Sequence, residues 1–190
     1  MDYKDYQHTR NAVWKLLIDT GADVLPIPVI SLCTQAGIEV RYDALLSGSR
    51  NSGYTTVAAD KPFILIDPEI SAERKRFTIA HELGHIILGH VGRYQLVARE
   101  PDPKDNPVEQ AANVFASRLL APACVLWGCR VKSPGEIARL CGISLTAAEY
   151  RYERYQQLLR RNKFLSSELE RQVYQQFNNF IRGHQQQGDY

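Results

Sequence analysis

Residues 81–85 read His-Glu-Leu-Gly-His, an H-E-x-x-H motif within a stretch whose apolar residues recur at helical spacing. Side chains four positions apart lie about 40° from each other around a helix, so the rings of His81 and His85 can reach one metal ion. Glu82 sits at the side of that face, where its carboxylate can take a proton from a zinc-bound water. Zinc would act there as a Lewis acid that polarises a carbonyl and lowers the pKa of the water to about 7.

A catalytic zinc site needs a third protein ligand, and two residues are candidates. His90 lies nine positions after His81, about 180° around a continued helix, so we expect it to point to the opposite face as a helix C-terminal histidine. Glu109 begins an E-x-x-x-N pattern that puts it on one helix face with Asn113. Glu109 would complete a His-His-Glu site, and Asn113 could accept a hydrogen bond from the outer ring N–H of a ligating histidine.

A purely structural role for Glu109 is also consistent with the sequence. Asn106 and Glu109 fit a helix N-cap followed by an acidic residue at the third helical position, so Glu109 could simply cap its own helix. We favour the ligand interpretation, because an H-E-x-x-H helix without a third ligand binds zinc poorly.

The stretches around these motifs predict an α+β fold. Strand-like patterns at 38–42, 54–59 and 63–66, the last two joined as a hairpin, predict a small antiparallel or mixed sheet of about three strands packed on the active-site helix. We expect a metallopeptidase core at 1–125, a helical C-terminal region at 126–183 and a disordered tail at 184–190. Helical patterns occur at 11–20, 29–37, 71–88, 108–120, 134–140, 144–161 and 166–181.

The composition is that of an ordinary globular protein, with 190 residues, 44% of them hydrophobic, and a net charge of +2. So small a net charge argues against binding to polyanions through bulk electrostatics. The polar N-terminus and the short apolar runs predict neither a secretion signal nor a membrane span, and hence a cytoplasmic protein. We expect reduced, partly buried thiols at Cys33, Cys124, Cys129 and Cys141.

Several segments together carry a family resemblance. They read Phe-Ile-Leu-Ile-Asp-Pro at 63–68, Arg-Phe-Thr-Ile-Ala before the H-E-x-x-H motif at 76–85, Glu-x-x-Ala-Asn-x-Phe-Ala at 109–116 and Leu-Leu-Ala-Pro at 119–122. Over about residues 62–122 the chain resembles the ImmA/IrrE family of zinc metallopeptidases.

The resemblance implies that His81, His85 and Glu109 bind zinc and that Glu82 is the general base of a peptide-bond hydrolase. It also implies a cytoplasmic bacterial or prophage endopeptidase that cleaves a helix-turn-helix transcriptional repressor and so releases a mobile-element or stress programme.

The predicted hairpin offers a way to bind a peptide substrate. Either strand 63–66 or its partner 54–59 could leave an edge exposed beside the zinc, to which an extended peptide would add through main-chain hydrogen bonds. The sequence leaves open which group stabilises the tetrahedral oxyanion. The candidates are Tyr54, His90, Arg93 and Tyr94.

Residues 136–149 have the sequence pattern of a helix-turn-helix, and the arginines and tyrosines that follow could contact phosphates. Glu149 and Glu153 lie among these arginines and reduce the positive charge of the second helix. We therefore expect the helix pair to pack on the core or to dock substrate, and not to bind DNA directly. The rival function is a non-catalytic regulator, or a toxin–antitoxin-type protein, whose C-terminal half binds DNA or a partner. Glu82 favours the enzyme, because a structural zinc site needs no carboxylate beside the metal.

Overall fold

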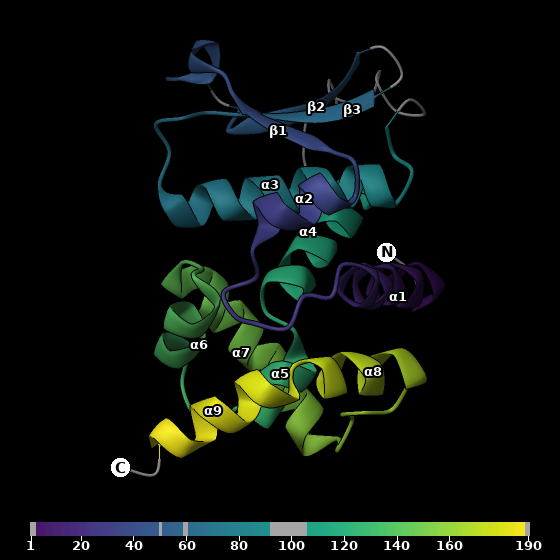
Figure 1. The fold of residues 1–190 in the computed structure, drawn as a ribbon, viewed down its shortest axis with the longest axis vertical. Coiled ribbons are helices and arrows are strands. Elements are labelled where there is room, and N and C mark those ends of the chain that lie inside the picture. The colour runs from purple at the N-terminus through teal and green to yellow at the C-terminus, as the bar shows by residue number, and fades with distance from the viewer. Residues whose placement is uncertain (1–2, 50, 59–60, 92–105, 189–190) are drawn as a thin grey trace. The chain divides into compact units, whose positions relative to one another are not determined.

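A three-stranded sheet with the order β1-β3-β2 is seen in the computed structural model of the chain (Figure 1). β1 (Glu39–Tyr42) pairs parallel with β3 (Lys61–Ile66), and β2 (Gly53–Ala58) pairs antiparallel with β3. The predicted three-stranded sheet and its hairpin are confirmed, and of the two alternatives, antiparallel or mixed, the sheet is mixed. β3 is central, so β1 and β2 are the edges among the described strands. The structure describes residues 3–49, 51–58, 61–91 and 106–188.

Helix α3 (Ala72–Ile87) carries the H-E-x-x-H motif and packs against β2 and β3 along one face of the sheet (Figure 1). Its first turn is capped by Ser71, whose hydroxyl accepts a hydrogen bond from the Arg74 backbone N–H at 3.2 Å. The helix ends at Ile87, and Gly89 follows with a φ of +72°. That left-handed conformation suits glycine and turns the chain away from the helix axis.

Helices α3 and α4 (Pro107–Leu120) approach each other closely beside the motif. A Cβ atom on Gly84 would lie only 3.0 Å from Cδ1 of Phe115, a fully buried side chain of α4. The glycine within the motif therefore permits a close helix contact. α2 (Val29–Gln35) packs on α3 and β1, and a 3-10 helix (Ala44–Leu46) follows β1.

The chain divides into two compact units. One contains residues 1–12 and 29–116, and the other contains residues 13–28 and 117–190, so the divisions fall within α1 (Tyr3–Asp19) and α4. The sheet, α2, α3 and most of α4 belong to the first unit. These units are defined by packing and do not coincide with the expected domain limit at 125/126, which stays a prediction.

The second unit is built from helices (Figure 1). α6 and α7 form the predicted helix pair, joined through Gly142 at a φ of +61° and capped by Ser144, whose hydroxyl accepts from Ala147 N–H. α5 is a helix that the sequence patterns did not predict. The bounds are α5 Ala123–Gly128, α6 Pro134–Cys141, α7 Leu145–Arg160, α8 Glu168–Gln176 and α9 Asn178–Gly188.

The end of the chain differs from its prediction in two ways. The expected helix at 166–181 is divided at the buried residue Phe177 into α8 and α9. Residues 184–188, expected to be disordered, continue α9. The side chain of Gln185 donates a hydrogen bond to the carbonyl of Gly128 at 2.7 Å, a tertiary contact that a polar tail sequence does not reveal.

The four cysteines are free, as predicted, and all four are buried, more fully than the partial burial that we expected. Burial raises the pKa of Cys33 and of Cys129 to about 12, so these thiols are protonated and inert at neutral pH. Among the described residues, Pro107–Gly128 is the one stretch long and apolar enough to cross a membrane. Because 72% of its most apolar part is buried, it has the character of a core segment.

Candidate metal centre

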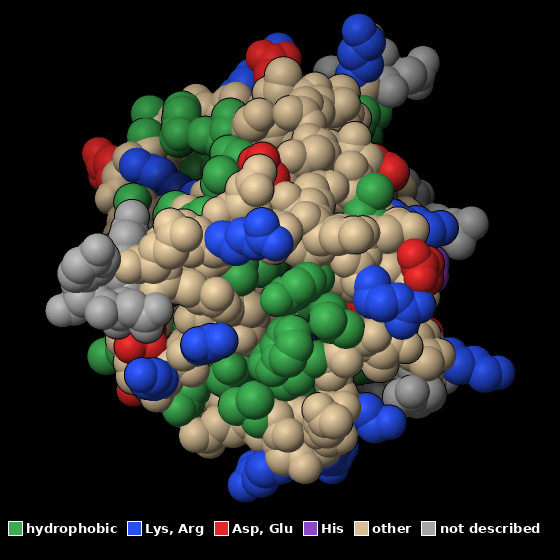
Figure 2. Space-filling model, turned by 60° about the horizontal axis from the view of Figure 1, so that its bottom comes forward, with side chains coloured by type: hydrophobic (Ala, Val, Ile, Leu, Met, Phe, Trp, Pro, Cys, Tyr) green, Lys and Arg blue, Asp and Glu red, His purple; other side chains and the backbone are tan. Residues whose placement is uncertain are grey.

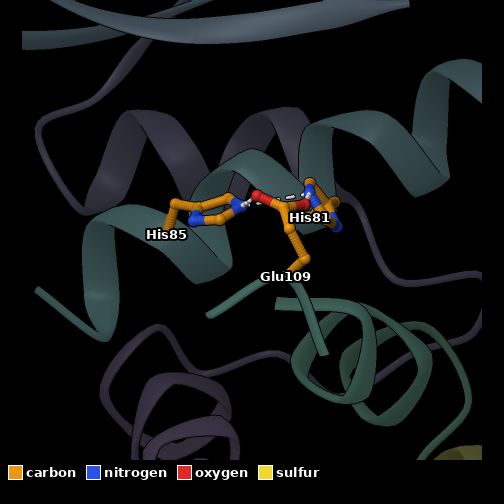
Figure 3. A group of neighbouring side chains, drawn as sticks. All are labelled: His81, His85 and Glu109. Atoms are coloured by element: carbon orange, nitrogen blue, oxygen red, sulfur yellow. Dashed lines mark hydrogen bonds and ion pairs between the residues drawn. The ribbon is translucent and has the colours of Figure 1, made fainter. Parts of the chain in front are cut away.

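Three side chains from two helices converge at one point (Figure 3). His81 and His85 project from α3, one turn apart, and the carboxylate of Glu109 reaches from the first turn of α4 to lie between the two imidazole rings. The Nε2 atom of His81 lies 3.2 Å from Oε2 of Glu109, and the Nε2 atom of His85 lies 3.3 Å from Oε1. The two Nε2 atoms are 3.1 Å apart.

These spacings fit a metal ion. Ligand atoms held about 2.0–2.1 Å from a tetrahedral ion stand roughly 3.3 Å from one another, close to the separations observed here. Two neutral imidazoles and one carboxylate are also the donor set of a familiar class of catalytic metal site, which has three protein ligands. Hydrogen bonds with His81 and His85 hold the pKa of Glu109 far below its usual range, so this group is an anion.

Asn113 fixes the orientation of one imidazole ring. Its Oδ1 atom lies 3.0 Å from Nδ1 of His81 and accepts the N–H of that ring. When a metal ion is bound, a proton on Nδ1 would leave the lone pair of the His81 Nε2 atom for the ion, in place of the hydrogen bond that Nε2 makes to Glu109 in the metal-free chain. The predicted support from the E-x-x-x-N pattern is therefore present in the structure.

His90 lies against His85, and the expectation that it points to the opposite face is wrong. Their Nδ1 atoms are 3.1 Å apart, and the backbone N–H of His90 donates to the His85 carbonyl at 2.8 Å. The expectation assumed a continuous helix, but α3 ends at Ile87 and Gly89 turns the chain back. Burial lowers the pKa of His90 to about 4, so its ring is neutral and can accept the Nδ1–H of His85.

Glu82 lies beside the cluster without joining it. Its Oε2 atom accepts a hydrogen bond of 2.8 Å from the hydroxyl of Thr55, a residue of the edge strand β2. Burial raises the pKa of Glu82, while the Thr55 hydroxyl, His81 and His85 act in the opposite direction. Thr55 is a site residue that sequence reasoning missed, because only its place in the paired strand brings it to Glu82.

The alternative role of Glu109 as a helix cap is filled by another residue. Oδ1 of Asn106 accepts the backbone N–H of Val108 at 2.9 Å and so caps the first turn of α4. The Glu109 carboxylate is directed to the two histidines instead. This geometry agrees with the ligand interpretation.

Two of the four candidates for stabilising an oxyanion, Tyr54 and His90, fall within the described residues, and the structure does not bring these two together. Tyr54 neighbours Thr55 in β2, and strand alternation directs it to the opposite face of the sheet. His90 is engaged by His85. Arg93 and Tyr94 lie outside the described residues.

A family model described as the IrrE N-terminal-like domain, a peptidase domain, matches residues 33–153. The match covers more than half of the chain and contains the whole His-His-Glu cluster. The chain therefore belongs to the IrrE N-terminal-like peptidase family. The resemblance found over residues 62–122 is confirmed.

Two relatives in the genus Deinococcus are similar to part of the chain. A radiation response metalloprotease IrrE of Deinococcus deserti is 32% identical over 114 residues, which cover 54% of this chain and 39% of the relative. The protein of the same name from Deinococcus radiodurans is 33% identical over 98 residues, which cover 46% and 29%. The matches span well under half the length of these relatives.

Proposed function

We propose that this protein is a zinc-dependent endopeptidase in which His81, His85 and Glu109 hold the zinc ion and Glu82 is the general base. The observation that carries the proposal is the position of Glu82. Its carboxylate lies next to the cluster, yet its Oε2 atom is bound by Thr55 and it is not one of the three converging side chains. A structural metal site has no need of such a group, whereas a hydrolase requires it.

When bound, zinc supplies Lewis acidity, which polarises the scissile carbonyl and acidifies a water. Glu82 accepts a proton from the attacking water, whose oxygen forms a bond to the carbonyl carbon. The C–N bond then breaks, and Glu82 passes the proton to the departing amine nitrogen. Burial raises the pKa of Glu82, which makes it a stronger base than an exposed carboxylate.

The edge of the sheet supports a peptide as the substrate. β2 lies at an edge of the described sheet, and its residue Thr55 touches the general base. An extended peptide that pairs with β2 would run past the reacting groups and gain main-chain hydrogen bonds. β3, the other strand considered from the sequence, is flanked by β1 and β2 and has no free edge.

We propose a helix-turn-helix transcriptional repressor of a prophage, mobile element or stress regulon as the substrate, in the cytoplasm. Support comes from the ImmA/IrrE resemblance and from relatives whose names describe a radiation response metalloprotease. We expect the protein not to bind DNA directly. On the face drawn in Figure 2, lysine and arginine side chains are seen among acidic, hydrophobic and other side chains.

The experiment compares new protein N-termini in a lysate of the source organism after incubation with zinc-loaded protein or with its Glu82→Gln variant. Both preparations must hold one zinc per chain, so that only the base differs. We expect a cut in a helix-turn-helix protein with the unaltered protein alone. A cut in another kind of protein would keep the peptidase and refute the substrate class.

Equal patterns with the two proteins would count against catalysis through Glu82. That result would favour the rival function, a non-catalytic regulator whose helical C-terminal half binds a partner or DNA. A gel-shift measurement with DNA from the gene's own genomic neighbourhood then distinguishes a regulator that binds DNA from one that binds a partner protein.

A further inference from the structure

We infer that Thr55 is a positioning residue for Glu82, holding one carboxylate oxygen so that the other faces the reacting water; this inference rests on the proposed peptidase function. The Oγ1 atom of Thr55 donates to Oε2 of Glu82 at 2.8 Å. Oε1 is then the oxygen left to accept the proton. The contact joins residues 27 positions apart in the chain.

The packing of β2 on α3 makes this contact a consequence of the fold. A Cβ atom on Gly53 would lie 2.8 Å from Cγ2 of Thr78, so Gly53 faces α3 beside Thr78. Two strand residues advance about 6.6 Å and four helical residues about 6.0 Å. The next inward residue of the strand therefore meets the next turn of the helix, which pairs Thr55 with Glu82.

A threonine side chain is well suited to hold the Glu82 carboxylate in one orientation. The hydroxyl donates a hydrogen bond to an anion, which is stronger than a bond between neutral groups. The β-branched side chain has few rotamers, so its donor is held in place without further partners. The contact also keeps the Glu82 carboxylate from turning toward the three metal ligands.

Thr55 belongs to the strand whose edge we propose for the substrate. A peptide that pairs with β2 would thus lie next to the residue that orients the base. Thr56, the following residue, pairs with Phe63 and points to the other face of the sheet. It provides a matched control, because the same substitution can be made one position away.

The test uses the full chain with Co²⁺ in place of zinc and acetohydroxamate as the probe. Acetohydroxamate binds the metal and gives its hydroxyl proton to a neighbouring carboxylate, so its affinity reports on the placement of that carboxylate. Visible absorption of Co²⁺ follows the titration and also shows that each variant holds the metal. The variants are Thr55→Val, Thr55→Ala, Thr55→Ser, Thr56→Val and Glu82→Gln.

We expect Thr55→Val and Thr55→Ala to raise the Kd for acetohydroxamate about three- to tenfold, because binding must then immobilise a free carboxylate. Thr55→Ser should restore the affinity, and Thr56→Val should leave it unchanged. Co²⁺ affinity should stay the same throughout, which a general loss of structure would not allow. Thr55→Ala keeps the test decisive if the valine variant does not fold.

Two different failures can be told apart. If Glu82→Gln weakens the probe but Thr55→Val and Thr55→Ala do not, the role of Thr55 is refuted while the general base stands. If Glu82→Gln binds the probe as well as the unaltered protein does, the proposed role of Glu82 as the general base is refuted, and the proposed function with it. An equal loss of acetohydroxamate affinity in Thr56→Val would also overturn the role of Thr55. It would show that any such substitution in β2 weakens the probe.

Discussion

The Nδ1 atoms of His90 and His85 lie 3.1 Å apart, so the ring of His90 supports the metal-facing orientation of His85. The Oδ1 atom of Asn113 supports the ring of His81 in the same way, at 3.0 Å from Nδ1. Each outer partner can accept a hydrogen bond from Nδ1–H of its histidine, which would leave Nε2 to face the candidate metal position.

We predict that His90→Ala lowers zinc affinity by about 10–100-fold, the usual effect of losing an outer partner of a ligating histidine. Competition with a zinc chelator of known affinity measures the change. His90→Asn should recover part of it, because an amide oxygen can accept the Nδ1–H of His85. His184→Ala, on α9, is the control. Unchanged affinity in His90→Ala would show that His85 keeps its orientation unaided.

His90 should also make the stability of the metal-free protein depend on pH. Its pKa is lowered to about 4 in the folded chain, mainly by burial, against about 6.5 in an unfolded chain. As the pH falls from 6.5 toward 4, the unfolded chain takes up a proton that the folded chain does not, so stability falls. The stabilising contribution is complete above pH 6.5.

Thermal unfolding of chelator-treated protein at several values between pH 7.5 and pH 4 tests this sign. The loss of Tm on acidification should be smaller in His90→Asn than in the unaltered chain. Parallel curves for the two proteins would mean that other groups cause the entire pH dependence.

Glu109→Gln should separate the ligand and cap interpretations. The amide keeps the size of the side chain but removes the anion, so we expect zinc affinity to fall by more than the roughly 10–100-fold of an outer partner. Glu168→Gln, which alters an exposed ion pair with Arg171, is the matched control. A residue that only capped α4 would give a different result, with unchanged zinc affinity and little change in stability, because glutamine also serves at that position of a capping box.

The glycine inside the motif can be tested through packing. Gly84→Ala should gain about 1 kcal/mol in helix propensity but lose about 1–3 kcal/mol through overpacking against Phe115. We therefore expect a net fall in the free energy of unfolding of up to about 2 kcal/mol, measured by urea denaturation. Zinc affinity should fall as well, since α4 carries Glu109.

Gly183→Ala in α9 is the control for this substitution. A Cβ atom there meets nothing within 4 Å, so the helix propensity gain should appear alone, as a stabilisation of up to about 1 kcal/mol. If both variants are stabilised, the α3–α4 contact has room for a methyl group.

Local patterns were sufficient to predict much of the fold. Ser71 and Ser144 cap the helices that their positions predict, and the two strand-like runs at 54–59 and 63–66 located the strands of the hairpin. The exceptions are stretches where tertiary contacts outweigh local preference. α5 is short and almost wholly buried, and Gln185 in α9 bonds to Gly128.

The sequence by itself predicted a candidate metal-binding chemistry, because two histidines four apart on a helix and an E-x-x-x-N pattern carry their geometry in their spacing. Only the tertiary structure decided the partners of that chemistry. The turn at Gly89 returns His90 to His85, and the packing of β2 on α3 brings Thr55 to Glu82. Helical periodicity holds only within one helix, so contacts made after a helix ends or between strand and helix depend on how the chain folds back.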